Sequence, residues 1–342
     1  MQIDFHHAVT YVVARFAGFS HAKAETIAYA AQYVDDSTET GYVRFDNEMR
    51  FYRQATSHPV YDPDNMDDDT DAESWLPFHF LPGNGGLDAG KTPPGPYIRK
   101  LVCRPGSPVA QAMAECALAD RDSPWGLHRL GIVAHVFADT WAHQGFVGLN
   151  DDINSAAAFE DANGNSIPVV PLPLPPVGHG QARHFPDQPW LVWSYQDADG
   201  KRVTRDNPAD FLTAADELCK LFQRWQQKTA AGLSPSQKQA ISECFASFTD
   251  EDEKIRHRSW LKAIAAGKFA FGSEELEYDA ERWKNEALGN KYTRGLLNLA
   301  KQGYPYAEGF VSSDWKLFHD AARCQRHDVF VRVLPAFHIL EN

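Results

Sequence analysis

One segment near the middle of the chain combines strong apolar character with ionisable residues at helical spacing. Residues 125–146 read WGLHRLGIVAHVFADTWAHQGF, and their pattern predicts a helix. Its regularly spaced ionisable residues are His128, His135, Asp139 and His143. At about 100° per residue, these four positions fall within about 80° of one another around the helix axis. They therefore share one face of the expected helix.

The neighbours of that face predict that the helix is buried. Ile132, Val136 and Phe137 are large and apolar, and an ionisable group without a partner is costly in such surroundings. His135 and Asp139 lie one helical turn apart, so an imidazole and a carboxylate can reach the same divalent cation. We interpret the four residues as candidate metal ligands. The alternative is a surface helix with ordinary contacts between histidine and aspartate four residues apart.

The composition is that of a globular, acidic protein. Of the 342 residues, 43% are hydrophobic and 23% are charged, and the formal net charge is −13. Broad nucleic-acid binding and anchoring to an anionic bilayer both need a positive surface, so the charge argues against them. An acidic protein can still act on phosphates where bound cations supply the positive charge.

Cysteine spacing and the first residues give an expected location. The five cysteines include no pair at CxxC spacing, and an odd number is a poor disulfide framework. The opening MQIDFHHAVTYVVARFAG lacks the basic start and uninterrupted apolar run of a signal peptide. No stretch approaches the ~18 apolar residues of a membrane span. We therefore expect a cytoplasmic protein in a reducing compartment.

The rest of the pattern predicts a single, mainly helical domain over residues 1–342. Residues 3–36 predict two helices separated by Gly18, and helices return after residue 108 and again after 208. Residues 57–108 are rich in Pro, Gly and Asp and predict a long loop region. Residues 159–205 predict an insertion with β-hairpin turns at DANGNSI and DADGKRV and the proline-rich VVPLPLPPVG between them.

Further candidate ligands lie near the start of the chain and in the loops. On the first expected helix, only one of His6 and His7 can face the core. The second helix ends in Asp35 and Asp36, which an antiparallel pairing returns to the start of the first. His79 lies in LPFHFLP, where prolines would hold its loop rigidly.

The segment VGHGQARHFPDQPW supplies more polar groups beside two tryptophans. It contains His179, His184 and Asp187, and the glycines that flank His179 indicate close approach of the backbone to another group. We take His179 as a further candidate metal ligand. The alternative is a tight turn with exposed histidines.

The order of these residues resembles that of the zinc-dependent phospholipase C and P1-type nuclease superfamily. An early histidine, an aspartate about thirty residues later, a loop histidine, H-x-x-x-D and a later histidine occur in the same sequence. The resemblance implies an all-α fold, a cluster of up to three zinc ions and hydrolysis of phosphate esters. The full length also resembles bacterial proteins without an established activity that open with I-D-F-H and carry A-x-Q-Y-V-D-D, H-x-F-A-D-T-W-A-H-Q-x-F and G-H-G.

The resemblance assigns expected roles to individual residues. His6 or His7 matches the early histidine, and His79 matches the loop histidine. The ligating carboxylate, which would also orient or deprotonate the attacking water, is Asp36 or Asp35. His135, Asp139 and His143 match the H-x-x-x-D pair and the histidine after it.

Two features of the superfamily have no evident counterpart. Its enzymes ligate zinc through the amino group of a processed N-terminal residue, and we expect this ligand to be missing where Met1 begins the chain. The final H-x-x-x-E pair is absent, because Arg183 lies four residues after His179. We therefore expect one or two divalent ions, zinc first among them.

The expected function is metal-dependent hydrolysis of a small phosphate-ester or phospholipid-type substrate. Asp4 and Gln144 are the expected outer partners of the ligands, and Trp141, Trp190 and Trp193 the expected pocket walls. Two alternatives stay open. An HD-type phosphohydrolase would use His319–Asp320 or His327–Asp328, and a non-catalytic protein would use the metal to brace its fold or would bind a partner.

Overall fold

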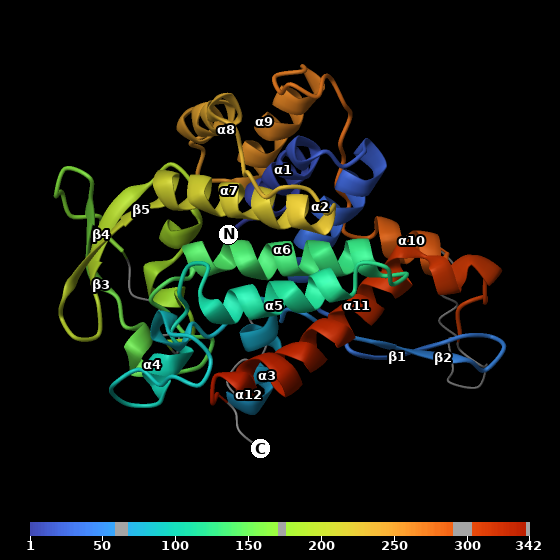
Figure 1. Ribbon diagram of the computed structural model, residues 1–342, viewed down its shortest axis with the longest axis horizontal. Helices are drawn as coiled ribbons and strands as arrows, with labels where there is room; N and C mark the ends of the chain where they lie inside the picture. The colour runs from blue at the N-terminus through green and yellow to red at the C-terminus, as the bar shows by residue number, and fades with distance from the viewer. Residues whose placement is uncertain (59–67, 170–175, 290–302, 340–342) are drawn as a thin grey trace.

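The computed structural model describes residues 1–58, 68–169, 176–289 and 303–339, together with the side chains of these residues except 68–71 (Figure 1). The chain is mainly helical, which confirms the predicted class. The proline-rich residues 170–175 of the predicted insertion and residues 59–67 of the predicted loop region lie outside the described residues.

Longer helices form most of the fold, and the strands belong to small antiparallel sheets. The helices are α1 (Thr10–Ala17), α2 (His21–Asp36), α3 (Asp68–Phe78), α4 (Ile98–Leu101), α5 (Pro108–Ala119), α6 (Gly126–Ala142), α7 (Asn207–Trp225), α8 (Pro235–Ser247), α9 (Glu253–Ala265), α10 (Arg282–Leu288), α11 (Asp314–Asp328) and α12 (Leu334–Ala336). The strands are β1 (Gly41–Arg44), β2 (Arg50–Arg53), β3 (Ala157–Asp161), β4 (Val192–Gln196) and β5 (Arg202–Asp206).

Shorter helical turns complete the architecture. Two are π-helices, η1 (Asp4–Val9) and η8 (Val329–Val333). The others are 3-10 turns: η3 (Asn84–Gly86), η4 (Asp152–Asn154), η5 (Gly180–Ala182), η6 (Phe185–Asp187) and η7 (Glu308–Ser312).

Helix α6 is the centre of the bundle. It contacts α2, α5, α7 and α11 (Figure 1), and apart from Leu127 all of its residues are buried, as its apolar sequence predicts. Gly131 allows the close approach of α2, because a Cβ atom there would lie 2.5 Å from the backbone oxygen of Ile27. This contact fixes the distance between the ends of α2 and α6 that carry the candidate ligands.

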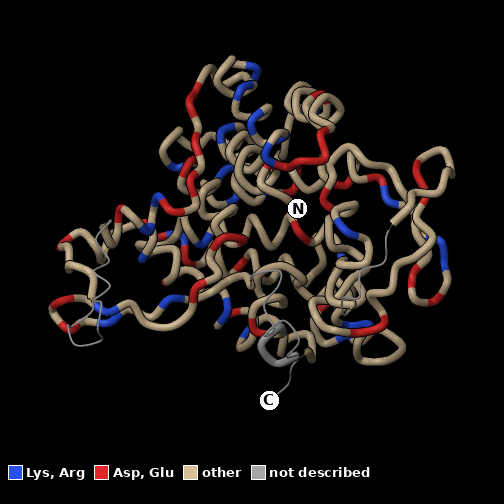
Figure 2. The backbone as a smooth tube through the Cα atoms, turned by 180° about the vertical axis from the view of Figure 1, so that it is seen from behind, with Lys and Arg blue, Asp and Glu red and all other residues tan. Residues whose placement is uncertain are grey.

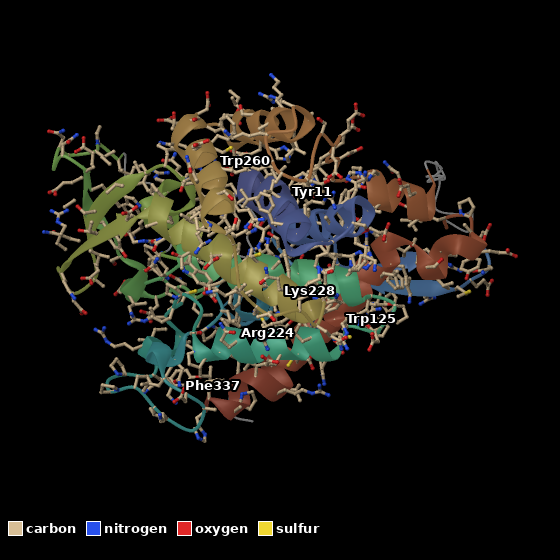
Figure 3. The ribbon with its side chains drawn as sticks, turned by 45° about the horizontal axis from the view of Figure 1, so that its top comes forward. Tyr11, Trp125, Arg224, Lys228, Trp260 and Phe337 are labelled. Atoms are coloured by element: carbon tan, nitrogen blue, oxygen red, sulfur yellow. The ribbon has the colours of Figure 1, made fainter. Side chains whose placement is uncertain are left out.

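The predicted pair of N-terminal helices is confirmed. Gly18 ends α1 in the left-handed conformation with φ 99°, which glycine adopts without strain. The Nζ of Lys228, at the end of α7, donates to the backbone oxygen of Ala17 over 3.0 Å. Figure 3 shows Lys228 beside the first helices and Trp260 of α9 on the same side of the molecule as Tyr11. Helices α7 and α9 thus hold the N-terminal segment against the bundle.

Two predictions for the loop-rich regions need correction. Residues 57–108 were expected as loop but include α3 and α4, and the buried Phe78 at the end of α3 explains why an Asp-rich start still leads into a helix. Residues 159–205 form part of a three-stranded antiparallel sheet, β3-β4-β5, rather than a hairpin alone. Both predicted turns occur. DANGNSI folds the chain back on β3 through an antiparallel bridge between Glu160 and Ser166, and DADGKRV joins β4 to β5.

Charged residues of both signs are interspersed along the described chain (Figure 2). Among the described helices, none is long and apolar enough to span a membrane.

Candidate metal centre

Six elements bring metal-capable side chains together beside the N-terminus. The ligand atoms lie within 4.8 Å of one another in each of three groups, and the groups are His6, Asp35 and His135; His79, His135 and Asp139; and His143, His179 and Asp187. His6 comes from η1, Asp35 from the end of α2, and His79 directly follows α3. The third group joins the end of α6 to η5 and η6. Buried His/Asp groups of this kind could hold a metal ion.

Asp139 is the hub of the arrangement. Its Oδ1 lies 3.2 Å from Nε2 of His6, and its Oδ2 lies 3.2 Å from Nε2 of His135 and 3.7 Å from Nδ1 of His79. Burial alone would raise the pKa of Asp139, but His143 and the amino group of Met1 hold that pKa well below its usual value. The carboxylate is therefore charged although its side chain is only 1% exposed.

Asp35 reaches the same histidines from the cleft side. Its Oδ1 lies 3.7 Å from Nε2 of His135 and 3.8 Å from Nδ1 of His79. Its side chain is 34% exposed, in contrast to Asp139. Burial of the carboxylate and the negative charge of Asp139 raise the pKa of Asp35 well above its usual value. A bound cation would relieve that repulsion.

Asp187 is a site residue that the sequence pattern contains but does not mark as a ligand. Its Oδ2 lies 3.5 Å from Nε2 of His179, and its Oδ1 lies 3.8 Å from Nε2 of His143. On a helix, a carboxylate that shares a metal ion with a histidine lies four residues after it, as Asp139 does after His135. The turns η5 and η6 instead bring together residues eight apart, and this spacing has no recognisable periodicity.

Three of the histidines, His6, His135 and His143, are held neutral, as metal ligation requires. Burial lowers the pKa of His6, His135 and His143, to about 3 for His143. A neutral imidazole has an N–H on one ring nitrogen and a lone pair on the other. The hydrogen-bond partner of the N–H therefore decides which nitrogen offers its lone pair to a metal ion.

In four of these histidines one ring nitrogen faces a backbone carbonyl. Nδ1 of His135 donates to Ala31 over 2.8 Å, and Nε2 of His79 donates to Thr56 over 2.9 Å. In the third group, Nδ1 of His143 donates to the carbonyl of His79 over 2.9 Å and Nδ1 of His179 donates to that of Arg183 over 2.8 Å. A carbonyl only accepts, so the other nitrogen of each ring carries a lone pair.

Those lone pairs face oxygens of Asp139 and Asp187, whose lowered pKa values leave them without a proton to share. Nε2 of His135 and Nδ1 of His79 also lie only 3.2 Å from each other. His6 adds to the imbalance, because neither of its buried ring nitrogens forms a hydrogen bond. Lone pairs and negative oxygens at 3.2–3.8 Å repel unless a cation lies between them. The side chains present therefore fit a divalent metal ion, with outer hydrogen bonds already fixing the imidazole tautomers.

The amino group of Met1 lies beside the candidate ligands. It is fully buried and lies 2.5 Å from Oδ1 of Asp139 and 3.3 Å from Oδ1 of Asp187, where it pairs with the carboxylates as a cation. Burial opposes its charge, but the two carboxylates raise its pKa to about 11. The amino group therefore links the Asp139 group to the Asp187 group.

Three of the candidate ligands lie outside the groups. The Nδ1 of His7 lies 2.9 Å from Nε2 of His257, so η1 directs His6 and not His7 into the centre. Asp36 accepts hydrogen bonds from Tyr278 and Gln32 and leaves Asp35 as the carboxylate that faces the histidines. His128 lies 2.8 Å from Oδ1 of Asp314, two turns along α6 from His135.

The expected outer partners and pocket walls also need correction. Asp4 forms a buried ion pair with Arg256, and Gln144 donates to Asp210, so neither touches the histidines. Trp141 and Trp193 are core residues. Trp190 packs against Arg256, whose Cζ lies 4.9 Å from the centroid of the Trp190 ring. Sequence position alone could not separate these tryptophans from one that faces the site.

A cleft of about 1080 Å³ gives access to the centre. Asp35, His79, Asp139, His143, His179 and Asp187 all line it. Other walls come from Trp75 and Phe80, from the first turns of α9 and from residues 278–280. The candidate ligands are thus reachable by a small molecule.

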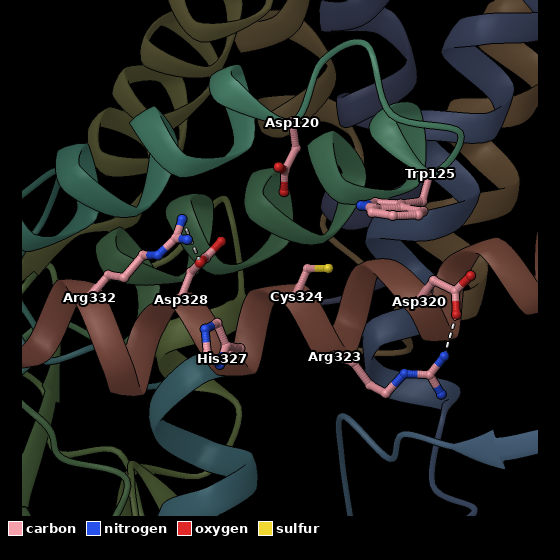
Figure 4. A pocket seen from close by; sticks show the side chains of 8 residues that line it. All are labelled: Asp120, Trp125, Asp320, Arg323, Cys324, His327, Asp328 and Arg332. Carbon is pink, nitrogen blue, oxygen red and sulfur yellow. Dashed lines mark hydrogen bonds and ion pairs between the residues drawn. The ribbon is translucent and has the colours of Figure 1, made fainter.

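The two His-Asp pairs of α11 lie in different surroundings. His319 is buried and accepts from the backbone N–H of Gln54, while Asp320 forms ion pairs with Lys316 and Arg323. The second pair lines a separate cavity of about 460 Å³, where Asp328 lies against Arg332 (Figure 4). Within the part of the chain that the structure describes, neither pair belongs to a group of metal-capable side chains.

The fold and the site define a mainly helical protein with buried His/Asp groups that could hold a metal ion. The chain belongs to a family of unknown function (DUF6765), whose family model matches residues 1–333. No curated protein and no solved structure gives a significant match.

Proposed function

We propose that this protein is a metal-dependent hydrolase of phosphate esters, with zinc as its metal and a fold related to phospholipase C and P1-type nucleases. The observation that carries the proposal is the orientation of the histidines. Four rings donate to backbone carbonyls and turn their lone pairs toward Asp35, Asp139 and Asp187 in an open cleft. Histidine nitrogens with carboxylate oxygens form a common ligand set of zinc.

The geometry favours two ions. His135 belongs to two of the three groups, but its single lone pair at Nε2 can bind only one ion. One ion would therefore use His135 with Asp139 and neighbouring ligands, and the other would use His143, His179 and Asp187. Bound cations would supply Lewis-acid activation of water and would offset negative charge on the phosphoryl group.

Asp35 is the residue assigned to water. It is the most exposed carboxylate of the three groups, and it lies within 4 Å of both His79 and His135. Its Oδ1 would orient the attacking water and accept its proton. Asp36, the other candidate, is occupied by its hydrogen bond with Tyr278.

The open cleft favours catalysis over a purely structural metal. Structural zinc sites are closed by four protein ligands, whereas catalytic sites keep a position for water or substrate. Here ligands of all three groups line a cleft large enough for a small substrate. For the same reason we prefer this site to the α11 pairs of an HD-type enzyme.

The test is metal content measured together with hydrolysis. Purified protein should hold about one or two equivalents of zinc, and His135→Ala and Asp139→Asn should each lose about one equivalent. His128→Ala is the matched control, because it removes a buried histidine from the same helix but outside the groups.

Activity on 4-nitrophenyl phosphodiesters and monoesters should follow the zinc content across these variants. An Asp35→Asn variant that keeps zinc should lose activity by at least tenfold, since general-base assistance typically contributes more than that. Protein that binds no zinc or manganese would contradict the proposal. Zinc-loaded protein that hydrolyses no phosphate ester would favour the structural role.

A further inference from the structure

Helix α9 places cationic side chains on the rim of the same cleft. Lys254 and Arg258 are four residues apart, so they share one face of α9, and both line the cleft together with His257. Both are exposed at the surface, in contrast to the buried His257. This face lies next to the metal centre but contributes no residue to its three groups.

Lys254 and Arg258 form no ion pair among the described residues, and neither does Lys262 further along α9, but only Lys254 and Arg258 line the cleft. Arg256, on the same helix, is buried in an ion pair with Asp4, and Lys268 is paired with Glu243. The chain as a whole carries 46 acidic residues against 33 basic ones. Two cations without an ion pair that line the same cleft offer favourable contacts to an anionic ligand bound there.

The position of this face is fixed relative to the metal centre. Nε of Arg256 donates to Oδ2 of Asp4 over 2.7 Å, and Nη2 of Arg256 donates to Gln2. Nε2 of His257 lies 2.9 Å from Nδ1 of His7, the residue after His6. These contacts join α9 to η1 and set the position of the rim cations relative to His6.

We propose that Lys254 and Arg258 bind a second anionic group of the substrate, separate from the phosphoryl group held at the metal centre. This inference rests on the proposed function and names its substrate class, which is phosphate esters with a further carboxylate or phosphate on the alcohol part. Glu253 and Asp279 also line the cleft and partly offset the rim charge. Recognition therefore requires both cations together.

The test compares two ligands that are not hydrolysed and that differ in one charge. Butyl methylphosphonate and 3-carboxypropyl methylphosphonate have similar lengths, and calorimetry with zinc-loaded protein measures their dissociation constants. We expect the carboxylate ligand to bind about fivefold more tightly, as two exposed ion pairs would provide. Raising the salt concentration should reduce this preference, because exposed charges are screened.

Variants assign the preference to the rim. The double substitution Lys254→Ala with Arg258→Ala should remove it and leave zinc content and butyl methylphosphonate binding unchanged. Lys262→Ala is the control, because Lys262 is an exposed cation of α9 that does not line the cleft. It should keep the preference.

The outcomes distinguish failure of this inference from failure of the proposed hydrolase function. Equal binding of both ligands to zinc-loaded protein, or a preference that survives the double substitution, would overturn the rim assignment and leave the proposed hydrolase intact. Protein that holds no zinc, or that holds zinc and binds neither phosphonate, would overturn both.

Discussion

At the scale of single residues, the hydrogen-bond partner of each histidine decides what that histidine can do. His128 and His135 lie on the same buried helix. Nε2 of His128 meets Asp314, whereas Nδ1 of His135 meets a backbone carbonyl and leaves Nε2 facing Asp139. A carboxylate partner accepts an N–H, so Nε2 of His128 is the protonated nitrogen, and its buried Nδ1 has no hydrogen-bond partner among the described residues. Nε2 of His135 instead carries the lone pair that faces Asp139, and it lies 3.2 Å from Nδ1 of His79.

His319 provides a pH prediction outside the metal centre. Burial lowers its pKa to about 3 and keeps the ring neutral, although a backbone contact with Gln54 acts in the opposite direction. In the unfolded chain a histidine has a pKa of about 6.5 and binds a proton below that pH. The unfolded state therefore gains protons that the folded state does not, and stability falls as the pH drops from 6.5 toward 3.

The expected cost at pH 5 is about 2 kcal/mol of unfolding free energy from this one residue. Urea unfolding of metal-free protein at pH 7 and pH 5 measures the loss. His319→Asn keeps an acceptor near Gln54 but does not titrate, so it should lose about 2 kcal/mol less than the unsubstituted protein over the same interval. An equal loss in both proteins would show that His319 does not remain neutral in the fold.

At the scale of elements, the contact between α2 and α6 controls how far Asp35 lies from His135. Gly131 faces the backbone of α2, and a Cβ atom would lie 2.5 Å from the oxygen of Ile27 and 2.6 Å from Cβ of Ala30. Backbone atoms cannot rotate away as a side chain can. Any residue larger than glycine must therefore separate the two helices.

Gly131→Ala should reduce the unfolding free energy by about 1–2 kcal/mol, because overpacking outweighs the better helix propensity of alanine. It should also weaken zinc binding, since α2 carries Asp35 and α6 carries His135 and Asp139. Denaturant unfolding and zinc titration measure the two effects. Gly309→Ala is the control, because a Cβ atom there meets nothing within 4 Å, and it should change neither quantity.

Elements with a regular apolar period could be predicted from the sequence, and so could the candidate ligands on them. The buried stripe of α6 predicted His135, Asp139 and His143 correctly as neighbours, and the antiparallel α1–α2 pair explains why Asp35 returns to His6. His128 shares the same face of α6 but lies too far along the axis, because angular position says nothing about which partner lies opposite. Asp187 is placed at the site by turns, and Lys254 and Arg258 are placed at the cleft by the tertiary packing of α9. Neither arrangement follows from a local sequence pattern.

At the scale of the whole molecule, the metal centre joins segments that are far apart in the chain. Its groups draw on η1, α2, the end of α3, α6 and the turns η5 and η6, while α9 holds η1 in place from residue 256. Without a cation, the same packing brings Asp35, Asp139 and Asp187 into one region with lone pairs of histidines. Metal binding should therefore be coupled to the stability of the whole fold.

Zinc at about a hundredfold excess over its dissociation constant should raise the unfolding free energy by about 3 kcal/mol. Thermal unfolding with zinc and with a chelator measures the difference as a shift in Tm. The shift should become smaller in His135→Ala, which removes a ligand of one of the two proposed ions, and should persist in full in His128→Ala. A shift of the same size in both variants would mean that zinc stabilises the protein from some other place.

The direction of His6 depends on the number of residues in the π-helical turn η1 as well as on their identity. A π-helix accommodates one more residue in its turn than an α-helix, and such turns occur often at functional sites. Here the turn directs His6 toward Asp139 and the adjacent His7 toward His257. Loss of any one residue between Asp4 and Val9 would turn the preceding positions by about 100° relative to α1. In a lineage of related sequences, this short segment should accept substitutions at several positions but no insertion or deletion.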